Sequence, residues 1–163
     1  MERGTDFLKS QVNNAVMQHK TFVDSLESHA QQAEDPRFRQ LCLKYLPRMT
    51  EHQGMLEQYQ RSLGGEPGSA KKVMGKILGA AKDVVDSARE TDFLRLVGDI
   101  VMARQAEDTF KTFRDAGRRL GEEQLARLGE VGEADHDDYA LEANRLVQDF
   151  FVEHVQAGVA AAR

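Results

Sequence analysis

Apolar residues recur along the chain at alternating steps of three and four, the spacing that keeps them on one face of an α-helix. Segments 5–33 and 36–63 show this pattern over their whole length. The first seam consists of Leu8, Val12, Ala15, His19, Phe22, Leu26 and His29. The second consists of Phe38, Cys42, Tyr45, Met49, His52, Leu56, Tyr59 and Leu63. Strand-like alternation is absent, so the pattern predicts an all-α protein.

The same spacing predicts two further long helices over 91–119 and 122–160, and a short one over 69–88. The third seam consists of Leu96, Ile100, Ala103, Glu107, Phe110, Phe113, Gly117 and Leu120. The fourth consists of Glu133, His136, Ala140, Ala143, Val147, Phe150 and His154. Glycine weakens a helix, so we expect the fourth helix to be loosened at Gly129 and Gly132.

Turn residues mark the helix ends. Asp35 can cap a helix that has Pro36 at its first position, Thr91 can cap another, and glycines follow 36–63 and 91–119. Pro47 lies inside 36–63 and lacks an amide hydrogen, which predicts a kink at this point.

Connection lengths then predict the topology. The first two helices are joined by a short turn and so are the last two, which makes two antiparallel hairpins. About 25 residues with their own short helix separate the hairpins. One long crossover of this kind is the ferritin-like version of the antiparallel four-helix bundle. We therefore expect residues 1–163 to form one such domain.

Charge and composition exclude several partners. The net charge of −5 argues against nucleic acid or an anionic membrane as the main partner. The chain starts without an apolar leader segment and has no apolar run of membrane-spanning length. Cys42 is the single cysteine, so an intrachain disulfide is excluded and a reducing compartment is favoured. A cytoplasmic protein is the expectation.

Five polar residues interrupt the apolar seams. They are His19, His52, Glu107, Glu133 and His136. At roughly 1.5 Å per residue, the members of each hairpin lie level to within about one turn. Glu133 and His136 form a Glu-x-x-His motif, which puts a carboxylate and an imidazole on one helix face. Bundles that hold two metal ions use two such motifs and a further glutamate from each remaining helix.

The rest of that ligand set is missing. Met49 stands three residues before His52, and His19 stands where a carboxylate is needed. Two alternatives remain open. One is a structural role, with His52 buried and hydrogen-bonded to Glu107, Glu133 or a tyrosine such as Tyr45. The other is one zinc or iron ion held by histidines and a carboxylate.

Short motifs along nearly the whole chain carry a family resemblance. They are Asp35-Pro36, the run His52, Leu56, Glu57, Leu63, Gly64, the stretch KVMGKIL, and Phe110 followed by Leu120-Gly121-Glu122-Glu123. In this order the chain resembles the ferritin-like superfamily, and within it the YciE/YciF-type bacterial stress-associated proteins. The resemblance implies a ferritin-like fold, a role in stress and a homodimer.

The metal residues of that family are only partly matched. His52 matches one of them, while His19 and His136 stand where the resemblance places glutamates, and Tyr45 stands where it places a second histidine. On the third helix the family's cluster falls on Ala103, Arg104 and Ala106, with Glu107 one position away. The resemblance therefore implies an eroded or rewired di-metal site.

These observations favour a stress-associated bundle protein with no catalytic residues and no organic cofactor. The alternative is a metal-binding protein that uses the five polar residues, and a weaker one is an oxidase of the ferroxidase type. A homodimer is expected also because Val16, Val23 and Val101 flank their seams and widen the apolar faces.

Overall fold

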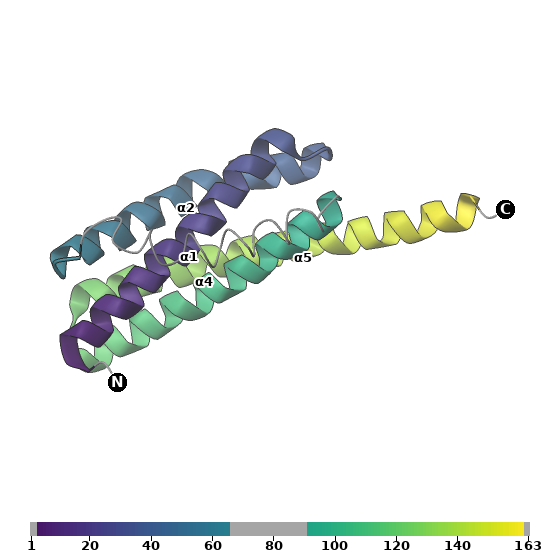
Figure 1. Cartoon of the computed structure of the whole chain (residues 1–163). Coiled ribbons are helices and arrows are strands. Elements are labelled where there is room, and N and C mark those ends of the chain that lie inside the picture. The colour runs from purple at the N-terminus through teal and green to yellow at the C-terminus, as the bar shows by residue number, and fades with distance from the viewer. Residues whose placement is uncertain (1–2, 66–90, 162–163) are drawn as a thin grey trace.

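The computed structural model describes residues 3–65 and 91–161, and all regular structure within these ranges is helical. The helices are α1 (Gly4–Gln32), α2 (Pro36–Ser62), α4 (Asp92–Leu120) and α5 (Glu123–Ala161) (Figure 1). The all-α prediction is confirmed, and each helix end lies within one residue of the predicted one. The predicted helix over 69–88 lies outside the described residues.

The helices pack as a ring in which each one has two neighbours. Helix α1 packs against α2 and α4, and α5 packs against α4 and α2. In Figure 1 the C-terminal part of α5 extends beyond the other helices. Residues 151–161 of this extension are exposed. The apolar core therefore lies between residues 8 and 150.

Local signals at the helix ends act as predicted. The Asp35 carboxylate accepts a hydrogen bond from Arg37 N at 2.7 Å, and Pro36 is the first residue of α2. Thr91 Oγ1 accepts one from Leu94 N, and α4 ends at Gly121, whose φ of 71° suits a residue without a Cβ. Helix α2 is continuous through the exposed Pro47, and the kink there stays a prediction.

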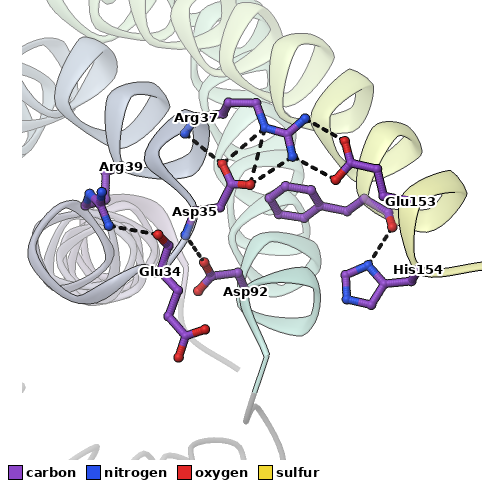
Figure 2. A network of polar contacts seen from close by, with 8 residues as sticks. Glu34, Asp35, Arg37, Arg39, Asp92, Glu153 and His154 are labelled. Atoms are coloured by element: carbon purple, nitrogen blue, oxygen red, sulfur yellow. Dashed lines mark hydrogen bonds and ion pairs between the residues drawn. The ribbon is translucent and has the colours of Figure 1, made fainter. Parts of the chain in front are cut away.

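Polar contacts tie three elements together at one end of the bundle (Figure 2). The Arg37 guanidinium contacts both Asp35 and Glu153, which joins the start of α2 to α5. Asp35 N donates to the Asp92 carboxylate at 2.7 Å, which places the start of α4 beside the α1–α2 turn. Helices α2 and α4 thus begin at the same end. The end of α2 and the start of α4 therefore lie at opposite ends of the bundle.

The core divides into two apolar clusters. One contains Phe22, Phe38, Tyr45, Met49 and Tyr139, and the other contains Val12, Leu56, Phe110, Phe113 and Leu125. Buried polar residues lie between them in the sequence of each contributing helix: His19 on α1, His52 and Gln53 on α2, and His136 on α5. A polar layer thus crosses the middle of the core.

Glycines allow α4 and α5 to approach closely. A Cβ at Gly129 would collide with the backbone of Phe110 and Arg114, and one at Gly132 would collide with the Phe110 ring. A Cβ at Gly117 would meet Ala126 N at 2.5 Å. The prediction that α5 is loosened at Gly129 and Gly132 is wrong. The helix is continuous there, because close packing against α4 offsets the low helix propensity of glycine.

Some apolar side chains remain on the surface. Val23 is buried within the chain, whereas Val101 is 62% exposed and Phe151, Val152, Val155 and Val159 of the α5 extension are at least half exposed. None of the helices in the two described ranges is both long and apolar enough to cross a membrane.

The glycine contacts predict a sharp contrast between two substitutions. Gly129→Ala should destabilise the fold by about 1–3 kcal/mol or more, because backbone atoms of α4 must move to admit the methyl group. Gly54→Ala is the matched control, since its Cβ would meet no atom within 4 Å and alanine favours helix by roughly 0.5–1 kcal/mol. Urea unfolding of both variants measures the difference. Equal stability of the two variants would contradict the close approach of α4 and α5.

Candidate functional site

Three buried imidazoles from three helices form the polar layer. His19 of α1, His52 of α2 and His136 of α5 are 3%, 1% and 0% exposed. The His136 ring centroid lies 5.0 Å from that of His19 and 5.8 Å from that of His52. The Phe110 ring contacts all three, with centroid separations of 5.0–5.9 Å. The three predicted histidines are thus brought together.

The outer nitrogen of His136 is a donor. Its Nδ1 lies 2.6 Å from the carbonyl oxygen of Gly132, one turn earlier on α5. A carbonyl oxygen can only accept, so Nδ1 carries the hydrogen. In a neutral ring Nε2 then holds the lone pair.

The outer nitrogen of His19 is a donor as well, and Gln53 determines this. The Gln53 amide nitrogen lies 3.2 Å from the carbonyl oxygen of Val16 and 2.8 Å from the Glu57 carboxylate. Both are acceptors, so the orientation of the amide group is fixed and its oxygen faces His19 Nδ1 at 2.9 Å. His19 Nδ1 therefore carries a hydrogen.

These assignments make the inner nitrogens face each other as acceptors. His19 Nε2 lies 3.0 Å from His136 Nε2, and in two neutral rings neither nitrogen has a hydrogen to donate. Two opposed lone pairs at this distance repel, and buried polar atoms are normally paired. A proton shared between the two nitrogens, or another cation, would relieve this repulsion.

Burial works against the proton. It lowers the pKa of His19 to about 4, partly offset by the hydrogen bond to Gln53 and reinforced by nearby His52. Burial likewise lowers the pKa of His136 to about 3, with His19 close by as a second cause. Both rings are therefore neutral at pH 7.

His52 contributes a third free lone pair. Its Nε2 donates to the Asp135 carboxylate at 2.7 Å, and Asp135 is also paired with Arg48. Its Nδ1 is buried with no hydrogen-bond partner among the described residues. His52 is buried and hydrogen-bonded as predicted, but the partner is Asp135 instead of Glu107, Glu133 or a tyrosine. Tyr45 donates to Glu142.

The two predicted glutamates lie in ion pairs with arginines. Glu107 accepts from Arg104 at 2.5 Å, and Glu133 is paired with Arg114. Among the described residues, no three side chains of the metal-binding types are grouped so that they could hold an ion together. The five residues expected to form one site therefore do not assemble as a group. The reason is that Ala106 and Gly132, their sequence neighbours, occupy the inward positions.

A second buried polar cluster was not predicted. Asp99 of α4 is fully buried, and its two oxygens accept from Ser25 Oγ and His29 Nδ1, both at 2.7 Å. Burial, and then the nearby Asp99, raise the pKa of the Tyr139 phenol. Because both Asp99 oxygens have partners on α1, this cluster joins α1 to α4.

A small cavity lies beside the histidines, between α1 and α4. Its volume is about 20 Å³, and it is lined by His19, Phe110, Ala15, Leu56 and Ala106 at the inner side and by Gln18, Met102, Gln105 and Thr109 toward the surface. Comparison with known proteins returned no matching family model, curated relative or solved structure.

The lowered pKa values of His19 and His136 predict that the folded protein loses stability in acid. The unfolded chain binds protons at these histidines near pH 6.5 and the folded chain does not, so stability is present above pH 6.5 and is lost as the pH falls. Between pH 7.5 and pH 5 the loss should be about 2 kcal/mol per histidine. Urea unfolding with a chelator at several pH values measures it.

The matched variants are His136→Phe and His154→Gln. His136→Phe should remove about half of the loss of stability between pH 7.5 and pH 5. His154→Gln, at the exposed end of α5, should leave this loss unchanged. A wild-type stability that is flat from pH 7.5 to pH 5 would contradict the neutral, buried state of both rings.

Proposed function

We propose that this chain is a ferritin-like bundle protein that binds one transition-metal ion between His19 and His136, in a role that is not oxidase catalysis. The helix arrangement supports the ferritin-like assignment. Helices α2 and α4 begin at the same end of the bundle, so the end of α2 and the start of α4 lie at opposite ends. A bundle with one such long crossover has the ferritin-like topology. The stress-associated role is part of the proposal through the resemblance alone. The homodimer is part of it through the resemblance and through exposed apolar residues such as Val101.

The opposed Nε2 atoms carry the proposal. A metal ion bonds to imidazole nitrogen at about 2.0–2.1 Å, so two nitrogens 3.0 Å apart subtend an angle of roughly 95° at the ion. Adjacent ligands of one ion stand at such angles. Each Nδ1 donates to an oxygen, the arrangement that orients histidine ligands in metal sites. The pair is thus built as two neighbouring ligands.

Charge favours one ion over two. Two divalent cations a few ångströms apart need several carboxylates around them, and the two histidines provide no negative charge. Negative charge is present one step away, since Glu57 accepts from Gln53 and Asp135 accepts from His52. This suits a single zinc or iron ion, or another imidazole-binding metal such as copper or nickel. A di-iron centre does not fit.

Metal binding should stabilise the folded protein. With Zn²⁺ at roughly 100 times its dissociation constant, we expect a gain of about 2.7 kcal/mol, because the ion binds only the folded state. His136→Gln should abolish the gain, and His154→Gln should preserve it. Calorimetric melting with and without Zn²⁺, together with titration of the metal, measures both.

If none of Zn²⁺, Fe²⁺ and Cu²⁺ stabilises the folded protein, the metal-binding proposal is contradicted and the histidines have a structural role only. A stoichiometric pair of iron ions in protein purified from iron-rich medium would contradict the single-ion site. Oxygen consumption with ferrous iron would contradict the role without oxidase activity.

A further inference from the structure

An apolar stripe runs along the outer side of α5 and continues onto its C-terminal extension. Its members are Leu141, Gln148, Val152, Val155 and Val159, which are spaced by steps of seven, four, three and four residues. This spacing keeps side chains on one face of a helix. The four apolar members are about half exposed, whereas the opposite side of α5 packs into the core.

The extension is a helix that its own bundle does little to stabilise. Residues 151–161 are all exposed, and Figure 1 shows them projecting past the other helices. Helices in water are stabilised mainly by the packing of an apolar face. Valine and glycine have low helix propensity, and the extension contains three valines and Gly158. A stable helix at this place therefore requires a cover over its apolar face.

Helix α4 carries a second apolar stripe beside that of α5. Leu94 and Val101 are both exposed and lie seven residues apart. The Arg104 guanidinium contacts the Asp137 carboxylate across the antiparallel α4–α5 pair. Val101 lies one turn before Arg104 on α4. Leu141 lies one turn after Asp137 on α5, which is the same direction because the helices are antiparallel. Val101 and Leu141 are therefore neighbours on the outer side of the bundle.

Together the two stripes form one apolar surface, which we term the outer face. It consists of Leu94 and Val101 of α4 and of Leu141, Phe151, Val152, Val155 and Val159 of α5, which are 41–62% exposed. At these exposures the seven residues present roughly 600 Å², the upper limit of the apolar patches on monomeric proteins. A standard interface contributes about 800 Å² per partner, of which somewhat more than half is apolar. The outer face thus has the apolar area that a stable dimer needs.

Charge and spacing fit a second copy of this chain. Residues 154–161 contain no Asp, Glu, Lys or Arg, so two extensions can meet without opposing like charges. In an antiparallel pair, the midpoint that sets Leu141 opposite Val159 also sets Gln148 opposite Val152. Such a stripe is complementary to itself, as a twofold interface requires.

We propose that the outer face binds a second copy of this chain, with the extension of each copy lying antiparallel along the α4–α5 outer face of the other. The valines of one extension then cover Leu94, Val101 and Leu141 of the other copy, and the reverse holds by symmetry. A parallel pairing would leave the stripe on α4 uncovered, because each extension would meet only the other extension. This inference rests on the proposed homodimer and deepens it by naming the interface, and it is independent of the metal site.

Light scattering of the full chain at micromolar concentration tests the interface. The wild type should have twice the chain mass of 18.3 kDa. Val155→Glu on the extension and Val101→Glu on α4 should each halve the measured mass, because the dimer would bury an unpaired charge. Both valines are exposed in the single chain, so neither change disturbs the core. Val131→Glu is the matched control, since Val131 is an exposed valine of α5 outside the outer face, and this variant should stay dimeric.

Cysteine cross-linking tests the direction of the pairing. The antiparallel arrangement sets Leu141 of one copy opposite Val159 of the other. A mixture of Leu141→Cys and Val159→Cys chains should therefore form a mixed disulfide dimer on oxidation. Neither variant should cross-link with itself, because its two introduced thiols lie far apart in the dimer. The native Cys42 is buried and does not interfere.

The outcomes separate this inference from the proposed function. A wild-type mass of 18.3 kDa would overturn the interface and the homodimer together, and the outer face would then be covered by another part of the same chain or by a different protein. A dimer that persists in both Val155→Glu and Val101→Glu would overturn the interface alone. Cross-linking of each cysteine variant with itself, or no cross-link in the mixture, would overturn the antiparallel pairing. The gain in stability with Zn²⁺ tests the metal site separately, and Val155→Glu should retain it.

Discussion

Two hydrogen bonds, each donated by the Nδ1 of a buried histidine, determine which ring nitrogens carry hydrogens at the centre of this protein. The Gly132 carbonyl oxygen and the Gln53 amide oxygen both take the Nδ1 hydrogen of a histidine. Once these hydrogens are committed, the inner nitrogens of His19 and His136 can only accept. The aromatic rings of Phe22 and Phe110 pack against both imidazoles. In two neutral rings these facing lone pairs repel, and the proposed metal site rests on this contact.

The hydrophobic periodicity was sufficient to predict the four long helices and the burial of three histidines. His19, His52 and His136 each occupy a regular seam position, and all three are buried. Their partners were not predictable in the same way. Gln53 lies beside His52 on the chain, and Asp135 is polar and half-buried, so neither stands out in a hydrophobic pattern. Their roles depend on contacts across 34 and 83 residues of sequence.

The face of α4 shows why the two glutamates were misplaced. Leu96, Ala103 and Phe110 belong to two seams with the same alternating steps. One adds Ile100 and Glu107, and the other adds Asp99 and Ala106. Hydropathy favours the first at Ile100, yet Asp99 is the residue that is fully buried, because Ser25 and His29 satisfy its carboxylate. On α5, Gly132 was not predicted as an inward position, since a glycine carries no hydrophobic signal.

Gly132 has a consequence for how this protein can change. Its missing side chain admits the Phe110 ring, its carbonyl oxygen orients His136, and the same ring contacts all three imidazoles. The spacing of two helices and the orientation of the His136 imidazole therefore depend on a single backbone position. A substitution that changes the packing of α4 against α5 near Gly132 therefore also changes the surroundings of the three buried imidazoles. A substitution at Gly132 therefore cannot change the spacing of α4 and α5 without also changing the orientation of His136.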